Sequence, residues 1–249
     1  MNLERHKEDW ERLAEVDALW AVLTDPEQKD GRWNTEAFFA TGEVEIAAVF
    51  SELERLGSKP RRFRALDFGC GVGRLTRALG TRFEAAVGVD ISAAMVEQAR
   101  RLNDAFPACE FHVNTTPDLS QFETNSFDFV YSSLVLQHLP SAAYVEGYVS
   151  EFLRLAGPQG LVVFAIPSHI SFPYSLQPRR RIYDLLRRLG VSEKWMLQRT
   201  SLTPMRMTVV READVRRLLK GRGATLLQAE AIGGGPVRAL RYYAAVSDR

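Results

Sequence analysis

The sequence predicts an α/β fold built on a parallel sheet, and three observations carry this prediction. Short apolar runs alternate with helical segments between residues 63 and 166. Closely spaced glycines follow the first run, in RALDFGCGVGRLTRAL at 64–79. Two final apolar runs, at 224–232 and 238–246, are separated by a short GGGP turn, which predicts an antiparallel hairpin. Because parallel strands need crossover helices, helices are expected on both faces of the sheet.

Two helices are expected before the sheet. Apolar residues recur at helical spacing over residues 3–23, at Trp10, Leu13, Val16, Trp20 and Leu23. Proline and glycine in residues 24–34 end this helix, and a second helix is expected over about 35–56, ending near Gly57. We interpret residues 1–57 as an N-terminal helical cap and residues 58–249 as the core domain.

The core is expected to alternate between strands and helices. The strands are expected at 63–68, 85–90, 110–113, 127–132 and 161–166, with helices at about 73–80, 92–105 and 142–155. Residues 167–208 hold four prolines and a basic helix around 179–189, and we interpret them as a lid inserted after the fifth strand. A further helix, at 211–220, leads into the final hairpin.

Composition narrows the class of protein. The chain has 249 residues, of which 46% are hydrophobic, enough for one α/β domain with attachments. Two cysteines, Cys70 and Cys109, provide neither a disulfide framework nor a metal-ligand cluster, so no metal is expected and a reducing, cytoplasmic compartment is favoured. The charged N-terminus does not resemble a signal peptide, and no apolar run approaches the roughly 20 residues of a membrane span, so no membrane partner is expected.

Charge is distributed unevenly along the chain. Residues 1–149 carry 15 Lys and Arg against 24 Asp and Glu, whereas residues 150–249 carry 17 against 7. The two halves either attract each other or are solvated, or the basic half meets an anionic ligand.

The glycine loop indicates which nucleotide the protein binds. Gly69, Gly71 and Gly73 are spaced G-x-G-x-G, and Arg74 stands where the third glycine of a dinucleotide fingerprint would fall. Asp67, at the end of the preceding strand, would repel a pyrophosphate, whereas Asp90, at the end of the next strand, can accept hydrogen bonds from ribose hydroxyls. A nucleoside with a cationic end, such as S-adenosylmethionine, satisfies both acids better than a nicotinamide dinucleotide does.

Three segments resemble a known family. LDFGCGVGRLT (66–76), VGVDIS (87–92) and SFDFVYSSLVLQHLP (126–140) resemble class I S-adenosylmethionine-dependent methyltransferases, in the small-molecule branch that includes the ubiquinone and menaquinone biosynthesis enzymes. The resemblance covers roughly residues 60–166. It implies a Rossmann-like, seven-stranded, mostly parallel sheet of order 3-2-1-4-5-7-6, in which the terminal hairpin supplies the last two strands.

The resemblance also implies a cofactor site. The three glycines would let the backbone approach the methionyl part of the cofactor, Asp67 would bind its amino group and Asp90 its ribose. Ile91 and Met95 would pack near adenine, and Asn114 or Thr115 would replace the acidic residue that the family often has after the third strand. Cys70 and Ser132 complete the assigned site; Cys70 and Met95 are equally interpretable as core residues.

One histidine is a candidate for the chemistry. His138 follows the fourth strand, at the sheet edge where open α/β sheets bind ligands, and either acts as a base toward the acceptor or packs as a structural residue. His169 is a weaker candidate, and His6 and His112 are interpreted as structural. The attachments that should cover the site contain aromatic residues, each of which either packs as a core residue, the favoured interpretation, or lines an acceptor pocket: Trp33, Phe38, Phe39, Tyr174 and Tyr183.

The predicted function is methyl transfer from S-adenosylmethionine to an oxygen or nitrogen of a small-molecule acceptor, with S-adenosylhomocysteine as product. Ser132, Ser133, Leu134 and Val135 stand where amino methyltransferases of nucleic acids carry an N/D-P-P-Y/F motif, so a nucleic-acid partner is disfavoured. Alternatives are an RNA or protein methyltransferase and a non-catalytic cofactor-binding protein. Residues 167–208, with the N-terminal helices, are expected to cover the acceptor site, and their arginines favour an anionic acceptor.

Overall fold

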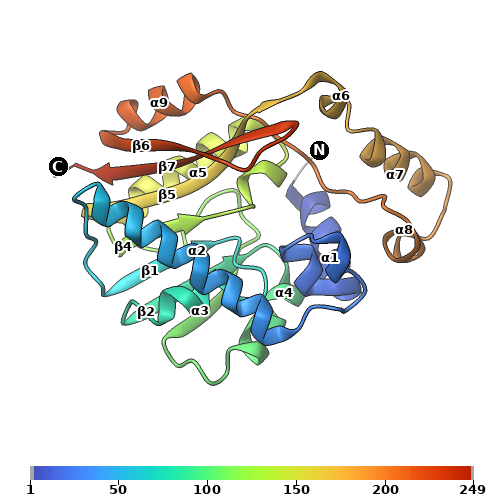
Figure 1. Ribbon diagram of the computed structural model, residues 1–249, viewed down its shortest axis with the longest axis horizontal. Helices are drawn as coiled ribbons and strands as arrows, with labels where there is room; N and C mark the ends of the chain where they lie inside the picture. The colour runs from blue at the N-terminus through green and yellow to red at the C-terminus, as the bar shows by residue number, and fades with distance from the viewer. Residues whose placement is uncertain (1–2, 248–249) are drawn as a thin grey trace.

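The computed structural model describes residues 3–247 and confirms the predicted sheet, in the order β3-β2-β1-β4-β5-β7-β6 (Figure 1). The strands are β1 (Arg64–Phe68), β2 (Ala85–Asp90), β3 (Cys109–Val113), β4 (Phe127–Ser132), β5 (Ala156–Ile170), β6 (Ala224–Ile232) and β7 (Val237–Val246). Strand β7 runs antiparallel to both of its neighbours, and the pairs among β1 to β5 are parallel. The predicted terminal hairpin is therefore confirmed.

The helices lie close to the predicted positions. They are α1 (Leu3–Val22), α2 (Thr35–Arg55), α3 (Arg74–Gly80), α4 (Ala93–Leu102), α5 (Ala142–Leu155), α6 (Phe172–Ser175), α7 (Pro178–Arg188), α8 (Glu193–Arg199) and α9 (Glu212–Gly221). Two short 3₁₀ turns, Pro26–Gln28 and Leu136–His138, complete the elements. The two helices that the sequence did not predict, α6 and α8, both lie in the segment interpreted as a lid.

Helices cover both faces of the sheet, as expected for this architecture (Figure 1). On one face, α2 and α3 pack against alternate strand residues such as Phe129 and Val163. On the other face, α5 and α9 pack against the intervening residues, among them Val130 and Val162. Successive side chains of a strand point to opposite faces of the sheet. Since helices cover both faces, both sides of each central strand are apolar and buried.

The two N-terminal helices have different neighbours, which divides the predicted cap of residues 1–57. Helix α2 covers the sheet, whereas α1 packs against α4 and α8. Helix α1 is also not one straight helix, because Asp17 has non-helical φ and ψ angles of −164° and 89°. The Asp17 carboxylate accepts hydrogen bonds from the Trp20 and Gly31 backbone N–H groups, at 3.2 and 2.8 Å, and so caps the second part of α1.

The segment interpreted as a lid begins later than expected. Strand β5 continues to Ile170, which pairs with Val237 of β7, so the first residues of 167–208 belong to the sheet. Helices α6, α7 and α8 follow and extend beyond the end of the sheet beside α1 (Figure 1). Within residues 3–247, no helix is both long enough and apolar enough to cross a membrane.

Candidate active site

A cavity of about 290 Å³ lies at the carboxyl ends of the central parallel strands. The predicted site residues that line it are Gly69, Cys70, Gly71, Asp90, Ile91, Met95, Asn114 and His138. Four other predicted site residues do not line the cavity: Asp67, Gly73, Thr115 and Ser132. The structure therefore gathers most of the predicted site at one edge of the sheet, where open α/β sheets bind ligands.

The glycine loop approaches the cavity wall so closely that it leaves no room for side chains. Gly69 and Gly71 have φ angles of +76° and +52°, in the left-handed region that glycine adopts readily. A Cβ atom on Gly69 would lie 2.2 Å from Cγ2 of Val135, and one on Gly71 would lie 2.3 Å from Cγ2 of Val22. Backbone rather than side chain therefore forms this part of the wall.

The third glycine serves packing and not the cavity. Gly73 has a φ of +87°, and a Cβ there would lie 2.6 Å from Nδ2 of Asn103 and 2.8 Å from the Phe111 ring. Both neighbours lie on the α4 and β3 side of the loop. This contact explains why a glycine is needed one residue earlier than in a dinucleotide fingerprint, and it places Gly73 in the support of the loop.

Asp90 fixes the loop from the neighbouring strand. Its two carboxylate oxygens accept hydrogen bonds from the backbone N–H groups of Gly71 and Ser92, each at 2.9 Å. Burial raises the pKa of Asp90, while these N–H groups and that of Ile91 lower it. Each oxygen keeps a further lone pair, so the carboxylate can hold the loop and still accept a bond from a ligand hydroxyl.

Asp67 and Ser132 lie behind the cavity wall, inside the sheet. Asp67 accepts a hydrogen bond from the Thr76 hydroxyl at 2.7 Å, and its other oxygen, Oδ1, is buried and has no hydrogen-bond partner within the described residues. Burial raises the pKa of Asp67 to about 7. Ser132 donates to the Phe68 carbonyl at 3.1 Å. Neither side chain lines the cavity.

A residue that the sequence analysis did not select, Glu11, ties α1 to this edge. Its carboxylate accepts hydrogen bonds from the Ser92 hydroxyl at 2.9 Å and from the backbone N–H groups of Ala93 and Ala94 at 2.7 and 3.0 Å. These N–H groups belong to the first turn of α4, whose positive dipole end favours a carboxylate. Glu11 therefore caps α4 from another helix and holds α1 over the Asp90 turn.

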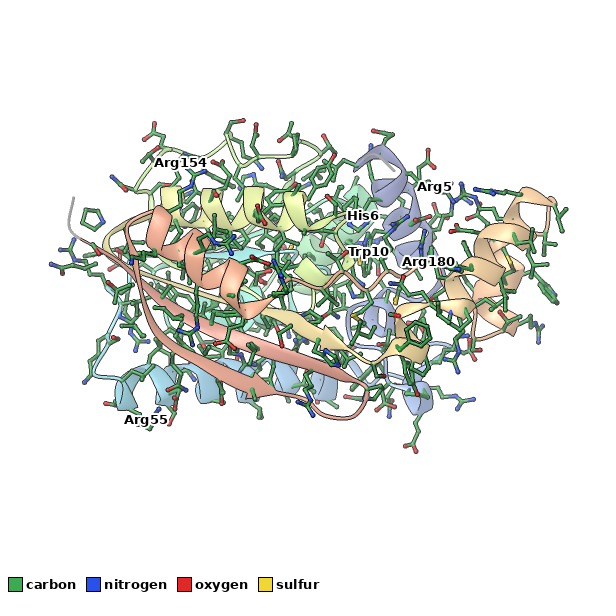
Figure 2. The ribbon with its side chains drawn as sticks, turned by 90° about the horizontal axis from the view of Figure 1, so that it is seen from above. Arg5, His6, Trp10, Arg55, Arg154 and Arg180 are labelled. Carbon is green, nitrogen blue, oxygen red and sulfur yellow. The ribbon has the colours of Figure 1, made fainter. Side chains whose placement is uncertain are left out.

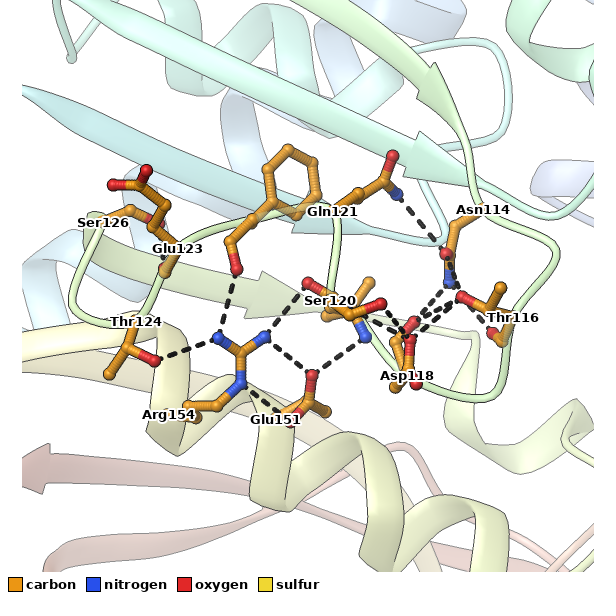
Figure 3. A network of polar contacts seen from close by, with 12 residues as sticks. Asn114, Thr116, Asp118, Ser120, Gln121, Glu123, Thr124, Ser126, Glu151 and Arg154 are labelled. Atoms are coloured by element: carbon orange, nitrogen blue, oxygen red, sulfur yellow. Dashed lines mark hydrogen bonds and ion pairs between the residues drawn. The ribbon is translucent and has the colours of Figure 1, made fainter.

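Asn114 is occupied by its own loop (Figure 3). Its amide donates to the carbonyls of Thr116 and Asp118 at 3.2 and 3.0 Å, and its oxygen accepts from the Thr116 hydroxyl at 2.9 Å. Arg154 of α5 donates to carbonyls at the other end of this loop, as Figure 3 shows. Asn114 thus shapes the cavity wall, whereas Thr115 is exposed to solvent.

His138 lies in a largely apolar part of the cavity with a defined tautomer. Its Nδ1 lies 2.8 Å from the Arg206 carbonyl, which only accepts, so Nδ1 carries the proton. Its Nε2 therefore presents a lone pair, which the Gln137 amide contacts at 3.2 Å. Burial lowers the pKa of His138 to about 4, so the ring is neutral at pH 7.

Trp10 of α1 joins two histidines across the cavity wall. Its ring meets His138 edge-on at 5.4 Å between centroids, and it meets His6 at 6.2 Å. Burial, followed by the nearby His138 and Arg206, lowers the pKa of His6 to about 4. Figure 2 shows His6 and Trp10 together on α1, beside the start of α7. His6, which the sequence analysis interpreted as structural, also lines the cavity.

None of the aromatic residues considered for the acceptor pocket lines the cavity. Phe38, Phe39 and Tyr183 are buried in a core cluster, and Tyr174 is exposed; neither these residues nor Trp33 line the cavity. His169 lies within β5, exposed and outside the cavity. The cavity is lined instead by side chains from α1 and from the chain before α7 and after α8: Leu3, His6, Trp10, Gln177, Met205, Arg206 and Met207.

Arg74, at the position that breaks the dinucleotide fingerprint, also lines the cavity. Its guanidinium is almost fully buried and donates to the carboxylate of Glu45 on α2 at 2.8 Å. The Tyr131 hydroxyl donates to the same carboxylate at 2.8 Å. The sequence carried a signal for Arg74 in its place directly after the third glycine, whereas nothing in it indicated Glu45.

Comparison with known proteins decides the family. Residues 66–164 match a family described as a methyltransferase domain. This segment forms a methyltransferase domain. It contains the glycine loop, Asp90 and His138, so the predicted resemblance to the methyltransferase family is confirmed.

Two curated proteins that the chain resembles are named as methyltransferases. The chain is 30% identical over 128 residues to 2-methyl-6-phytyl-1,4-hydroquinone methyltransferase of Synechocystis sp., which covers 51% of this chain and 39% of that protein. It is 33% identical over 106 residues to ubiquinone biosynthesis O-methyltransferase of Neisseria meningitidis, covering 41% of this chain and 43% of that one. These matches therefore span less than half of the relatives' own length.

A solved structure shares the fold over nearly the whole chain. Magnesium protoporphyrin IX methyltransferase from Synechocystis, solved with bound S-adenosylhomocysteine, superposes with a TM-score of 0.64 at 20% identity, over 99% of this chain and 100% of that chain. The same protein with S-adenosylmethionine bound gives a TM-score of 0.61. The fold therefore extends beyond the methyltransferase domain match, although the residues of α1 and of 177–207 lie outside that match.

Proposed function

We propose that this protein binds S-adenosylmethionine in the main cavity and transfers its methyl group to an oxygen or nitrogen of a small-molecule acceptor. The observation that carries this proposal is the turn formed by Gly69, Gly71 and Asp90, where glycine backbone and a hydrogen-bonding carboxylate meet at the cavity wall. The methyltransferase domain match and the relatives named as small-molecule methyltransferases support it.

The residues of the cavity fit this cofactor. Asp90 would accept a hydrogen bond from the ribose through its remaining lone pairs, and Ile91 and Met95 would pack beside the base. Arg74 provides a cation for a carboxylate, and it is kept in place by Glu45. Asp67 does not line the cavity, so it would act on the cofactor only electrostatically. A cation in the cavity would favour the ionised form of Asp67 and so lower its raised pKa. When bound, the cofactor supplies an electrophilic methyl group on a sulfonium.

His138 would orient the acceptor. Its Nδ1 proton is held by the Arg206 carbonyl, so Nε2 is free to accept a hydrogen bond once the Gln137 amide turns away. An acceptor hydroxyl or amine that donates to Nε2 points a lone pair away from the ring, and the proton that the acceptor loses on methylation would pass to Nε2 and then to solvent. The low pKa makes His138 a weak base, so orientation and proximity would supply most of its contribution.

A second cavity, of about 140 Å³, adjoins the acceptor side and favours an anionic acceptor. Gln177, Arg206 and Met207 line both cavities, and Arg180 and Arg181 complete a lining without acidic residues. A guanidinium can bind a carboxylate or phosphate through two hydrogen bonds. We place the anionic group of the acceptor here, and its reacting group near His138.

We also propose a cytoplasmic location, since Cys70 and Cys109 are both free thiols, as is usual in a reducing compartment.

The test of transfer uses S-adenosylmethionine with a panel of catechols, hydroxylated aromatic acids and amines, with S-adenosylhomocysteine formation as the readout. We expect acceptor-dependent product, a rate about 10²-fold lower in His138→Ala, and S-adenosylhomocysteine affinity within about threefold of the unmodified protein. His112→Ala, on β3 and outside the cavity, is the matched control. Absence of cofactor binding, or transfer that His138→Ala leaves unchanged, contradicts the proposal.

The anionic preference has its own test. For an acceptor found in that panel, the carboxylate form should have a KM about tenfold lower than the corresponding amide. Arg181→Gln should remove this preference, whereas Arg61→Gln, an exposed arginine outside both cavities, should retain it. Equal KM values for acid and amide in the unmodified protein would overturn the preference without affecting the methyltransferase proposal.

A further inference from the structure

Helix α7 has apolar residues on two sides, and only one of these sides is buried. Its inward side combines Tyr183, which is fully buried in a core cluster, with charged residues that face α1. Asp184 accepts from Arg5 at 2.8 Å, and Arg187 lies 3.5 Å from Asp9. Amphipathic helices of globular proteins usually turn their remaining side to water with charged residues. The side chains of Ile182, Leu185 and Leu189 are instead 47, 56 and 71% exposed.

These three residues form one apolar stripe. Their spacing of three and four residues places them on the same side of the helix. The neighbouring α6 segment exposes Phe172, Tyr174 and Leu176, and α8 exposes Trp195. Within the described residues, seven of the eleven exposed large hydrophobic side chains therefore fall between residues 172 and 195. Such a concentration marks an interaction surface and not the scattered exposure that ordinary surfaces show.

Cations border the stripe. Exposed Arg179 lies on one side of it around the helix, and exposed Arg181 and Arg188 lie on the other. Residues 167–208 carry eight Lys and Arg but only two acidic residues. Both acids are engaged inward, because Asp184 binds Arg5 and Arg180 while Glu193 accepts from Tyr183 at 2.7 Å. The outward charge of this segment is therefore positive.

We propose that the apolar stripe of α7, with its bordering arginines, binds the surface of a membrane that contains anionic lipids. An apolar stripe rimmed by cations is the pattern by which interfacial helices enter the headgroup region, and this binding mode needs no spanning helix. The expectation of no membrane partner rested only on the absence of a spanning segment. Charge complementarity selects an anionic bilayer, since the exposed cations meet the headgroups while the leucines enter the acyl boundary.

The location of the stripe connects it to the proposed function, on which this consequence rests. Leu176 and Arg181 belong to the exposed segment and also line the second cavity beside the acceptor site. An acceptor dissolved in the bilayer would then reach the cavity from the membrane side, with its anionic group among the arginines. The structure thus points to an amphiphilic, lipid-soluble acceptor class.

The experiment is flotation with phosphatidylcholine vesicles and with vesicles that contain about one third phosphatidylglycerol, without cofactor. The unmodified protein should bind the anionic vesicles at least tenfold more strongly, and less so as salt rises. Leu185→Ser with Leu189→Ser should weaken this binding at least tenfold. Val44→Ser is the matched control, since Val44 is also 71% exposed but belongs to α2, which covers the sheet apart from α7 (Figure 1).

Three outcomes overturn the proposal: no binding to anionic vesicles, binding that the double variant retains, and self-association that the double variant abolishes in place of vesicle binding. The last outcome, measured by sedimentation velocity, would make the stripe an interface between copies of the chain. S-adenosylhomocysteine calorimetry on the same variants separates the two proposals. A failure of the membrane proposal leaves cofactor binding intact, whereas a failure of the proposed function removes it in every variant.

Discussion

The glycine-loop edge and the cover formed by α1 with α6–α8 meet at one cavity but are built by different physics. At the edge, glycine conformations and short hydrogen bonds set the geometry, as in the contact between Gly71 and Asp90 across 19 positions of the chain. In the cover, side chains about 180 positions apart hold the two parts together: Arg5 binds Asp184, and Arg12 binds Glu193.

The cover also differs in what it buries. Asp9 is buried among arginines, and burial raises its pKa to about 6 although Arg5 and Arg187 lower it. Arg187 lies 3.5 Å from both Asp9 and Glu193. Buried ion pairs contribute little net stability, but losing one partner leaves an uncompensated charge. The glycine-loop edge is therefore specified by the local backbone, whereas the cover depends on the specific docking of helices that are distant in sequence.

Breaking the edge should have the largest effect. Gly71→Ala places a Cβ 2.3 Å from Val22 at a positive φ, so the loop and α1 must separate. Overpacking of this kind costs about 1–3 kcal/mol, and we expect S-adenosylhomocysteine affinity to fall about 10- to 100-fold by calorimetry. Gly31→Ala is the control, because Gly31 also has positive φ but nothing within 4 Å of the added Cβ. Equal losses in the two variants would show that strain, not contact, is responsible.

Loosening the joint between the regions should have the next effect. Glu11→Gln removes the charge that caps α4, and we expect the free energy of unfolding to fall by about 1–2 kcal/mol. Cofactor affinity should weaken with it, because α1 is then held less firmly over the Asp90 turn. Glu15→Gln, one turn along α1 and exposed, controls for the charge change. Denaturant unfolding measures the free energy of unfolding, and calorimetry measures cofactor affinity. If neither changes in Glu11→Gln, α1 does not support the cofactor site.

Weakening the ion pairs within the cover should affect the cover and leave the glycine-loop edge unchanged. Arg187→Met leaves Asp9 and Glu193 without a shared cation, which should cost about 1–2 kcal/mol after allowance for partial exposure. Limited proteolysis should then cut residues 171–210 faster, while S-adenosylhomocysteine affinity stays within about twofold. Arg188→Met, exposed and next in sequence, should change neither. A large loss of cofactor affinity in Arg187→Met would mean that the regions are not independent.

The smallest effect concerns pH. His138 has a folded pKa of about 4, below its unfolded value of 6.5, so the unfolded state binds more protons between these values and stability falls as pH drops through this range. From pH 7 to pH 6 this histidine should cost the protein about 0.7 kcal/mol. Urea unfolding of the unmodified protein and of His138→Asn at both pH values isolates this contribution. Equal pH dependence in the two proteins would contradict the buried, neutral ring.

The sequence predicted the edge well because its signals are local. Gly69 and Gly71 need a positive φ, and the strand ends place Asp90 beside them, so spacing located these three residues. The other residues of this wall, Ile91, Met95 and Asn114, were assigned from the family resemblance. Asp67 was placed on the correct strand, but its side chain is buried and accepts a hydrogen bond from Thr76 of α3 instead of lining the cavity. Strand and helix bounds in the core followed from the alternation of apolar runs for the same local reason.

The cover could not be predicted in the same way. His6 and Trp10 line the cavity only because α1 packs against α4 and α8. The spacing of residues in the sequence does not predict which helices pack together. The aromatic residues of the attachments show the same limit, since the sequence left both a core and a pocket-lining interpretation open for Phe38 and Tyr183, and both pack into a core cluster. The outward apolar stripe of α7 was likewise hidden, because periodicity shows that a helix has two sides but not which side faces the protein.

Calorimetric titration with S-adenosylhomocysteine and with NADH shows whether the cavity at the glycine-loop edge binds S-adenosylmethionine. We expect one S-adenosylhomocysteine bound per chain, no NADH binding, and an affinity at least tenfold weaker in Asp90→Ala, which loses a charged hydrogen-bond acceptor worth about 1.5–3 kcal/mol. Tight NADH binding without S-adenosylhomocysteine binding, or equal affinity in Asp90→Ala, would contradict this assignment of the cavity.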